Sequence, residues 1–365
     1  MTTVPINDLS RWDSSELNEL STHIRRVLES GHFMLGSNTK ALETHLGERL
    51  GGRNVICVGN GTDAITVALA GLGLQPGDKV ATVANAGGYA TGVLLRMQCI
   101  PVFVDIDPST AQISVASFKE TVSLHPDLKA VVVTHLYGLM ADIDGICDIA
   151  HKNDIRVVED CAQAIGASLD LIEAGAWGDA STFSFYPTKN LGCLGDGGAV
   201  AFRDPTHADL ARRIAQYGWS ERYTISENNG FNTRIDEIQA AILLVRAKSL
   251  NKNNDRRRTI VRDYAASLSD KYSLVWQDDL SYVGHLAVMI CPDRKKAQSV
   301  LRQHEIGHGV HYPISDHQQP AWKSLFKETT LPNTEAFVNS IITIPCFPSM
   351  HESEIHQVCA ALSDL

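Results

Sequence analysis

The feature that most constrains the fold is a regular alternation of short β-branched runs with longer amphipathic segments. The runs are NVICV near residue 54, KVATV near 79, PVFVD near 101, AVVVTH near 130, RVVED near 156, STFSF near 181 and AVAF near 199. The gaps between the first six runs hold segments long enough for crossover helices, such as TDAITVALAGLGL and DIDGICDIAHKND. This pattern predicts an α/β fold with a seven-stranded, mostly parallel sheet.

Helical spacing marks both flanks of this region. Near the start, SSELNELSTHIRRVLES predicts an amphipathic helix that Ser14 or Ser15 can cap and that Gly31 ends. Beyond the strands, EIQAAILLVRAKSLNKNNDRRRTIVRDYAASL predicts one long helix or two, followed by short strands and the helix RKKAQSVLRQH. We therefore predict a large domain over 1–245 and a smaller C-terminal α+β domain over 246–365.

Charge and cysteine usage exclude several classes of function. The 365 residues include 32 basic and 42 acidic side chains, a net charge of −10, which argues against binding nucleic acid or an anionic membrane. The eight cysteines are scattered and form no CxxC pair, as is typical of a reduced, cytoplasmic protein. MTTVPINDLSRWD is not a signal sequence, and no window approaches 18 uninterrupted apolar residues, so neither secretion nor membrane spanning is expected.

A candidate phosphate site follows the first strand, in GNGTDAITVAL. Here Gly61 and Thr62 begin a helix, where free backbone N–H groups and the helix dipole favour an anion. Neither GxxxxGK[ST] nor GxGxxG occurs, which argues against a P-loop or a Rossmann dinucleotide site. A simple strand-to-helix turn remains the alternative.

Polar residues also follow the fifth run, in VVEDCAQAIGA. Glu159 and Asp160 lie where a buried strand ends, and Gln163 follows. A carboxylate there needs a cationic or hydrogen-bonding partner, such as a protonated heterocycle nitrogen. The alternative is an aspartate that caps the next helix.

A lysine occupies the gap between the last two runs, in FSFYPTKNLGCLGDGGAV. This gap has no helical periodicity, so we expect a functional loop that carries Lys189 after Ser184, Tyr186 and Thr188. A lysine among aromatic and small apolar residues is costly unless its amine is neutral or covalently used, as in Schiff-base chemistry. A phosphate site, a strand-end aspartate and an enclosed lysine together predict pyridoxal 5'-phosphate as cofactor.

The ordered motifs resemble the DegT/DnrJ/EryC1/StrS family of sugar aminotransferases, which have the type I aspartate aminotransferase fold. The resemblance covers nearly the whole chain. It is carried by GNGTDAITVAL, PVFVDIDP, HLYG, VVEDCAQAIGA, GDASTFSFYPTKNLGCLGDGGAV, GFNTRIDEIQAAIL, GVHYPISDHQQPAW and ITIPCFPSMHESEI. Family members that remove a sugar hydroxyl carry histidine at the position of Lys189, so the resemblance favours transamination over dehydration.

The resemblance implies a role for each cofactor residue. Lys189 would form the internal aldimine and shuttle a proton, and Asp160 would pair with the pyridine nitrogen. Gln163 would bind the ring hydroxyl. The phosphate would be held by Gly61, Thr62, Ser184 and, from the neighbouring subunit, Asn232. The implied assembly is a homodimer with shared active sites.

The implied reaction transfers an amine from L-glutamate to a nucleotide-linked keto-deoxysugar with ping-pong kinetics. His311, Tyr312 and His317 match the family's substrate-side segment, and Tyr186 is a further candidate on the lysine loop. Candidates for binding the nucleotide are Arg222 and Tyr223 in QYGWSERY, a segment that resembles relatives acting on dTDP-3-keto-6-deoxyhexoses. Two alternatives stay open: a sugar without a nucleotide as acceptor, and a non-catalytic regulatory protein that binds the cofactor.

One segment departs from the family pattern. Many relatives carry an aromatic residue in a TFxAT-like segment that stacks on the cofactor ring, whereas this chain has NAGGYATG. Alignment on Ala90 and Thr91 leaves Gly88 at the aromatic position. Tyr89, from a shifted backbone, is then the candidate for stacking.

Three further motifs have simpler explanations. HEIGH, 304–308, matches HExxH, but Gly307 and Gly309 end the helix there, so we expect no metal site. The run DRRRT is interpreted as a solvated helix face rather than a nucleic-acid site. Cys161 and Cys193 lie beside proposed site residues, but nothing in the sequence indicates a reactive thiolate.

Overall fold

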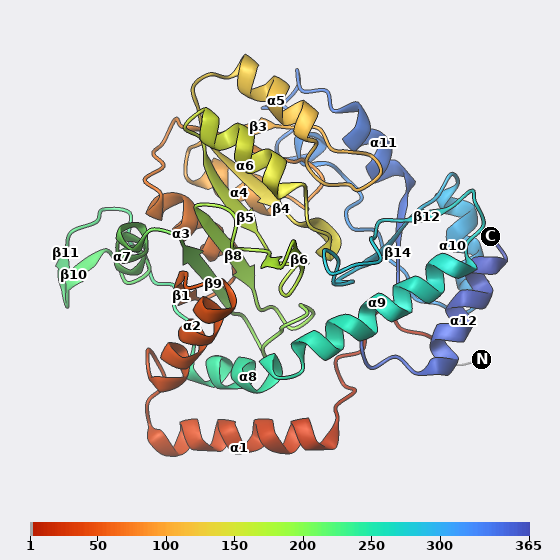
Figure 1. Cartoon of the computed structure of the whole chain (residues 1–365), viewed down its shortest axis with the longest axis horizontal. Helices are drawn as coiled ribbons and strands as arrows, with labels where there is room; N and C mark the ends of the chain where they lie inside the picture. Colours follow the sequence, from red (N-terminus) through yellow and green to blue (C-terminus); the bar gives the residue numbers. More distant parts are fainter. Residues whose placement is uncertain (1–2) are drawn as a thin grey trace.

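A seven-stranded sheet forms the centre of the molecule in the computed structural model, which describes residues 3–365 (Figure 1). Its strands are β1 (Asn54–Val58), β2 (Lys79–Thr82), β3 (Ile100–Phe103), β4 (Leu128–Thr134), β5 (Arg156–Asp160), β8 (Ala180–Ser184) and β9 (Gly198–Phe202). The order is β1-β9-β8-β5-β4-β2-β3, and every pairing is parallel except those of β9 with β1 and β8. The predicted mostly parallel sheet is confirmed.

Helices cover both faces of this sheet. They are α2 (Ser37–Arg49), α3 (Gly61–Gly71), α4 (Tyr89–Arg96), α5 (Val115–Leu124), α6 (Ile143–Lys152) and α7 (Pro205–Ile214). Alternate strand residues enter different cores: Val131 and Val133 of β4 pack in one, and Ala130 and Val132 in the other. Both faces are therefore buried, which explains why the strands read as nearly continuous apolar runs.

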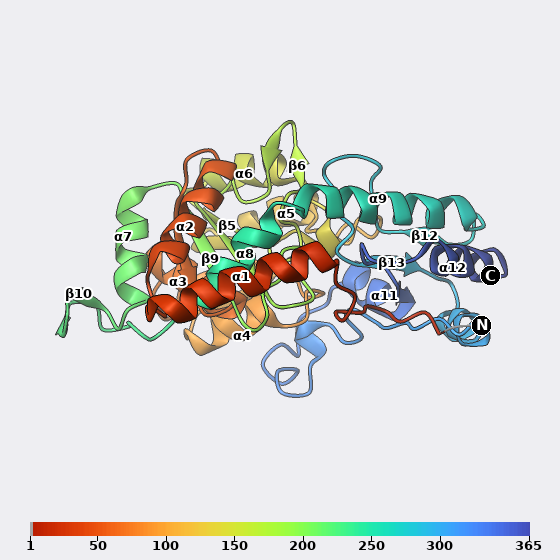
Figure 2. The same ribbon diagram turned by 90° about the horizontal axis from the view of Figure 1, so that it is seen from below.

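The leading helix α1 (Ser14–Ser30) packs along α8 (Glu237–Ala247) through Leu20 (Figure 2). It ends at Gly31, which has φ 65°, as predicted. Its cap, however, is Asp13 rather than a serine, because the Asp13 carboxylate accepts from the backbone N–H groups of residues 15 and 16.

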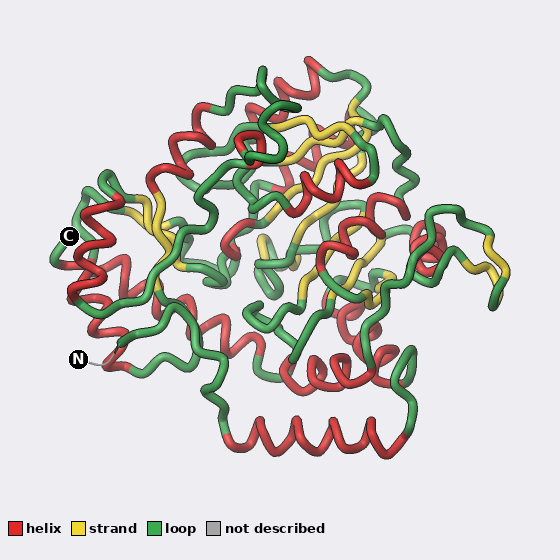
Figure 3. The backbone as a smooth tube through the Cα atoms, turned by 180° about the vertical axis from the view of Figure 1, so that it is seen from behind, coloured by secondary structure: helices red, strands yellow, loops and turns green. Residues whose placement is uncertain are grey.

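A second, smaller α+β unit follows α8. It contains α9 (Leu250–Ser267), β12 (Ser273–Leu274), β13 (Ala287–Ile290), α10 (Arg294–Gln303), α11 (Pro332–Ser340), β14 (Ile341–Ile344) and α12 (Glu352–Ser363). Strands β12, β13 and β14 form an antiparallel sheet at the end of the molecule that holds both termini (Figure 3). Val4 pairs with Ile306 of this unit, so the first described residues lie against it although α1 packs on α8. The division at 245/246 stays a prediction.

Two short helices and two short hairpins complete the chain. They are η1 (Leu136–Gly138), η2 (Asp316–Gln318), β6 (Ser168–Leu169) with β7 (Ile172–Glu173), and β10 (Trp219–Glu221) with β11 (Thr224–Ile225). The β10–β11 hairpin extends beyond α7, away from the body of the molecule (Figure 1). Among the residues that the structure describes, no helix is long and apolar enough to cross a membrane.

The arginine run in α9 corrects one expectation. DRRRT is not a solvated face, because Arg257 is only 5% exposed and donates to the backbone carbonyls of Cys346 (2.6 Å) and Gly284 (3.4 Å). Arg258 donates to the carbonyl of Tyr282. These arginines therefore bond α9 to loops of the C-terminal unit. A pattern of charges in the sequence does not show such contacts.

Candidate active site

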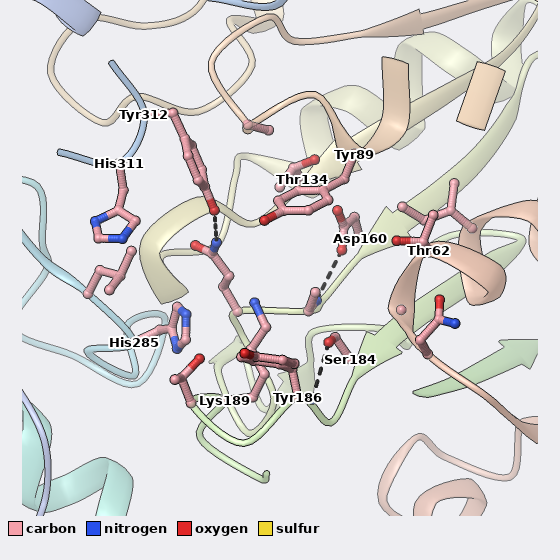
Figure 4. Close-up of a pocket in the computed structure, with 18 of the residues that line it drawn as sticks. Thr62, Tyr89, Thr134, Asp160, Ser184, Tyr186, Lys189, His285, His311 and Tyr312 are labelled. Atoms are coloured by element: carbon pink, nitrogen blue, oxygen red, sulfur yellow. Dashed lines mark hydrogen bonds between the residues drawn. The ribbon is translucent and has the colours of Figure 1, made fainter. Parts of the chain in front are cut away.

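A cavity of about 820 Å³ opens at the carboxyl ends of the parallel strands (Figure 4). Its walls come from the start of α3, the ends of β4, β5 and β8, the loop after β8, and segments of the C-terminal unit near residues 285, 311 and 343. This is the edge at which open α/β sheets bind ligands, and the volume suits a cofactor with a substrate.

The phosphate site predicted at the start of α3 is shaped by one glycine. A Cβ at Gly61 would lie 2.7 Å from Cβ of Ser184, so only glycine lets the helix start approach this serine. Asn60 caps α3 by accepting from the N–H of Asp63 (2.8 Å). Gly61, Thr62 and Ser184 therefore line one corner of the cavity, where a helix N-terminus and two hydroxyls are suited to hold an anion.

Asp160 ends β5 and is 6% exposed. It accepts from the N–H of Ala162 (3.1 Å), but no helix follows, so it is not a helix cap. Burial raises the pKa of its carboxyl group, and the positive charge of Lys189 opposes this shift. Within residues 3–365 it makes no ion pair within 4 Å, which leaves it suited to a cationic ligand nitrogen.

Lys189 lies in the turn after β8 and points into the cavity (Figure 4). The backbone N–H of Lys189 donates to the carbonyl of Tyr186 (2.8 Å). The turn is so tight that a Cβ at Gly192 would lie 2.6 Å from the carbonyl oxygen of Pro187. Burial lowers the pKa of the Lys189 amine, while Asp160 opposes this shift. A lowered pKa favours the neutral, nucleophilic amine.

Gln163 is held on two sides. Its Oε1 accepts from the N–H of Tyr137 (2.6 Å), and its Nε2 donates to the hydroxyl of Tyr312 (3.3 Å). Because a backbone N–H fixes which amide atom is the oxygen, the nitrogen faces the cavity.

The unusual NAGGYATG segment makes room for side chains of the C-terminal unit. A Cβ at Gly87 would lie 2.9 Å from the ring of Tyr312, and one at Gly88 would lie 3.1 Å from Trp322. Tyr89, the first residue of α4, lines the cavity with its ring 6.2 Å from that of Tyr312. Tyr89 is therefore the aromatic residue that this segment contributes to the wall, and its stacking on the cofactor ring stays a prediction.

The two candidate histidines separate. His311 lines the cavity, with Nδ1 2.9 Å from Oγ1 of Thr343, and burial lowers its pKa. His317 does not line the cavity: it is 3% exposed and its Nε2 lies 3.1 Å from Glu335. Tyr186 lines the cavity and is 53% exposed.

The three candidates beyond α7 lie outside this cavity. Arg222 and Tyr223 sit on the β10–β11 hairpin, with the guanidinium 4.9 Å from the centre of the Tyr223 ring, and they line a separate hollow of about 740 Å³. Asn232 is exposed and pairs with Gln216. A single copy of the chain therefore does not bring these residues to Lys189.

Several cavity residues were not predicted from the sequence. His285 lines the wall, with Nδ1 3.0 Å from Oδ1 of Asn190. Burial, and to a smaller extent the positive charge of Lys189, lowers the pKa of His285 well below its usual value. Ile6 and Asn7 reach the cavity from the N-terminal segment. No local motif marks them, because they approach from segments distant in sequence.

Other reactive-looking groups have structural partners. His135, Glu159 and Cys161 lie within metal-ligand reach of one another. However, the two carboxylate oxygens of Glu159 bond His135 (3.0 Å) and accept from the N–H groups of residues 175, 177 and 178 (each 2.8 Å). Each oxygen thus has two hydrogen-bond partners and is not needed as a metal ligand. Burial raises the pKa of the Cys161 thiol and raises that of Cys193 to about 11, so neither is a ready thiolate.

The HEIGH segment lacks zinc-site geometry. α10 ends at Gln303, and His304 lies 2.8 Å from Asp364 while His308 lies 3.1 Å from the carbonyl of Ile306. The two histidines therefore share no helical face.

The residues present fit pyridoxal phosphate. The cavity combines the candidate anion site at Gly61, the buried carboxylate of Asp160, the amide nitrogen of Gln163 and the amine of Lys189. These groups match, respectively, the phosphate, the protonated ring nitrogen, the ring hydroxyl and the aldehyde of this cofactor.

Comparison with known proteins agrees with this fit. Residues 15–363 match the model of the DegT/DnrJ/EryC1/StrS aminotransferase family. A pleiotropic regulatory protein of Geobacillus stearothermophilus is 36% identical, with 99% of this chain and 98% of the relative covered. The UDP-N-acetyl-3-dehydro-alpha-D-glucosamine 3-aminotransferase of Acidithiobacillus ferrooxidans is 32% identical, with coverage of 99% and 97%. The dTDP-3-amino-3,4,6-trideoxy-alpha-D-glucose transaminase of Streptomyces venezuelae is also 32% identical, with coverage of 99% and 96%.

Solved structures show the same architecture. DesV of S. venezuelae in complex with a ketimine intermediate has a TM-score of 0.95 and 31% identity, with 100% of this chain and 98% of that chain covered. NtdA of Bacillus subtilis with bound pyridoxamine phosphate has a TM-score of 0.93 and 30% identity, with coverage of 99% and 85%. The chain therefore belongs to the DegT/DnrJ/EryC1/StrS aminotransferase family, and the predictions of fold, enzyme class and cofactor are confirmed.

Proposed function

We propose that this aminotransferase moves an amino group from L-glutamate to the keto carbon of a nucleotide-linked deoxysugar, by ping-pong kinetics. The observation that carries the proposal is the meeting of Lys189, Asp160 and the anion site at Gly61 in one cavity. The UDP-linked and dTDP-linked substrates in the names of relatives support a nucleotide sugar as acceptor. Within that class, the QYGWSERY segment favours a dTDP-3-keto-6-deoxyhexose.

Each residue has a stated task in this proposal. Pyridoxal phosphate, when bound, supplies an electron sink that stabilises negative charge at the amino-bearing carbon. Lys189 would take the proton from that carbon of the donor and, in the second half-reaction, would deliver a proton to the acceptor carbon that becomes amino-bearing, tasks for which an amine of lowered pKa is suited. Asp160 keeps the ring nitrogen protonated, and the buried carboxylate gains a cationic partner in return.

The acceptor side is built from different elements. His311 and Tyr186 lie on the cavity wall, where they can contact the sugar. Arg222, Tyr223 and Asn232 would reach a neighbouring subunit's cavity in a homodimer, where the arginine would meet the diphosphate. The exposure of Tyr223, 73%, and of the nearby Ile225, 67%, supports a partner surface at the hairpin. We further propose that the enzyme works in the cytoplasm.

The first test is the visible absorbance of the purified protein with pyridoxal phosphate, before and after L-glutamate. We expect a visible band that disappears as glutamate is converted to 2-oxoglutarate. Addition of a dTDP-linked keto-sugar should restore the band, and L-alanine serves as a control donor. A band that persists with glutamate would refute the donor, and no band at all would refute cofactor binding.

The same assay separates the alternatives left open. A regulatory protein that only binds the cofactor would show the band without turnover of any donor, a possibility raised by the name of the Geobacillus relative. An acceptor without a nucleotide would restore the band as quickly as the dTDP-linked sugar. If the nucleotide supplies binding energy used in the transition state, removing it should lower kcat as well as raise KM.

A further inference from the structure

The HLYG motif has no task in the proposed chemistry, yet it forms a junction beside the cofactor cavity. Its Tyr137 is fully buried and has φ 63°, a left-handed conformation that is uncommon for a residue other than glycine. Gly138 follows with φ 88°, and a Cβ there would lie 3.0 Å from both the carbonyl oxygen of Gln163 and the backbone nitrogen of His285. The turn is therefore pressed between the large sheet and the C-terminal unit.

Tyr137 bonds both sides of this junction. Its N–H donates to Oε1 of Gln163 (2.6 Å), on the side of the large sheet. Its hydroxyl donates to the carbonyl of His311 (2.5 Å), on the side of the C-terminal unit. Burial raises the pKa of the Tyr137 hydroxyl well above the usual value, so the group stays protonated and acts as a donor.

A second tyrosine, Tyr312, bonds the other end of the Gln163 carboxamide. Tyr312 follows His311 directly, and its hydroxyl accepts from Nε2 of Gln163 (3.3 Å). Figure 4 shows this bond at the cavity edge, with the ring of Tyr312 beside Tyr89. The carboxamide of Gln163 is thus held at its oxygen by Tyr137 and at its nitrogen by Tyr312. One N–H of Nε2 remains for a ligand.

We propose that Tyr137 and Tyr312 are positioning residues. They orient the carboxamide of Gln163 toward the ring hydroxyl of the cofactor, and they couple this carboxamide to the acceptor-side segment at His311. The inference rests on the proposed function, because it takes the cofactor's ring oxygen as the group that Gln163 meets. A displacement of the His311 segment would then change the hydrogen bond given to the cofactor. Binding at the acceptor side and the ionisation of the cofactor would be linked through two hydroxyl groups.

The test uses hydroxyl deletions, which keep the rings. In Tyr312→Phe, Nε2 of Gln163 loses its partner and becomes less well oriented. We expect the pH midpoint of the visible absorbance of the cofactor-loaded enzyme, without substrate, to move by about 0.3 to 1 unit. In Tyr137→Phe the backbone bond to Gln163 stays, so we expect mainly a rise of about three- to tenfold in KM for the keto-sugar.

Two comparisons make the result specific. Tyr264→Phe is the matched control, because Tyr264 is also fully buried but its hydroxyl contacts Met350, away from the cavity. It should leave the pH midpoint and KM unchanged. The double variant of Tyr137 and Tyr312 should shift both quantities by less than the sum of the single shifts, since the Tyr137 hydroxyl holds the carbonyl of His311, next to Tyr312, and so reaches Gln163 through Tyr312.

A wild-type pH midpoint in Tyr312→Phe would overturn the proposal, as would additive effects in the double variant or equal shifts in Tyr264→Phe. These outcomes differ from failure of the proposed function. That failure would appear in the wild-type protein itself, as absence of the visible band or of its loss with L-glutamate.

Discussion

The cavity at Lys189 and the β10–β11 hairpin are built in opposite ways. In the cavity, each proposed cofactor group is held by backbone contacts: Asp160 by an N–H at residue 162, Lys189 by its tight turn, and Gln163 by Tyr137. On the hairpin, Arg222 lies over the ring of Tyr223, which meets Trp219 edge-on and is 73% exposed. The comparison shows that the groups proposed to bind the cofactor are fixed within one chain, whereas the hairpin residues proposed to bind the nucleotide lie on an exposed surface.

The largest effect is expected at the cavity lysine. Lys189→Ala should lower turnover by about 10⁴-fold or more, because both half-reactions need its amine for proton transfer. Steady-state kinetics with glutamate and keto-sugar, together with circular dichroism to verify the fold, make the measurement. Lys248→Ala, on the exposed surface beside Glu19, is a suitable control. Substantial turnover by the Lys189 variant would disprove its central role.

The next effect tests whether the hairpin side serves a neighbouring cavity. Asn232→Asp should lower turnover by about 10²-fold, because a carboxylate would face the cofactor phosphate. Mixing this variant with Lys189→Ala should restore activity, since one cavity of a mixed dimer then carries both wild-type residues. The recovery is measured after joint refolding or co-expression. If the mixture stays inactive while dimers form, the two residues do not share a cavity between subunits.

A pH effect is expected from a buried carboxyl group packed against α4. Burial raises the pKa of Asp316 to about 6, and its carboxylate accepts from the hydroxyl of Thr91 (2.5 Å) beside Tyr89. The folded chain therefore keeps a proton that the unfolded chain releases near pH 3.8. This group makes the free energy of unfolding fall as pH rises from about 4 to 6, by roughly 2 to 3 kcal/mol in total.

Urea unfolding of the wild type and Asp316→Asn at about pH 4 and pH 7 measures this contribution. The wild type should lose stability relative to the variant at the higher pH. Equal differences between the two proteins at both pH values would show that Asp316 titrates normally. Asp209→Asn, at an exposed position in the hollow near the hairpin, controls for the loss of a carboxylate as such.

The smallest effect separates the two histidines of the HYPISDH segment. His311→Asn should raise KM for the keto-sugar by about three- to tenfold, because it removes a polar group from the cavity wall. His317→Asn should leave this KM within about twofold, since His317 faces Glu335 instead. Acceptor kinetics at saturating glutamate decide the matter. A larger effect at His317 would mean that the segment rearranges when the sugar binds.

Sequence reasoning succeeded where the signal was local. The seven strands, the helix-free loop at Lys189 and the C-terminal ends of α1 and α10 all follow from periodicity and from the positions of glycines. Asp160 could be placed because a carboxylate at the end of a buried strand has few uses.

Contacts between distant segments could not be predicted in the same way. Arg257 was expected in solvent because its neighbours are charged, but carbonyls from two remote loops bury it. His285 and Asn7 carry no motif, and only the packing of the C-terminal unit and of the N-terminal segment near the sheet brings them to the cavity. The different surroundings of His311 and His317 likewise depend on tertiary packing, since both lie in one short segment.

The reversed strand β9 has a practical consequence for laboratory evolution. Because β9 runs antiparallel to β8, the chain must return within the loop that carries Lys189, and the loop is fastened at both ends by Ser184 opposite Gly198 and by the N–H of Phe185 bonded to Gly197 (2.8 Å). An inserted or deleted residue there would redirect the lysine. Libraries that aim at new acceptors should therefore keep the length of 186–197 fixed and vary the length and composition of 219–225.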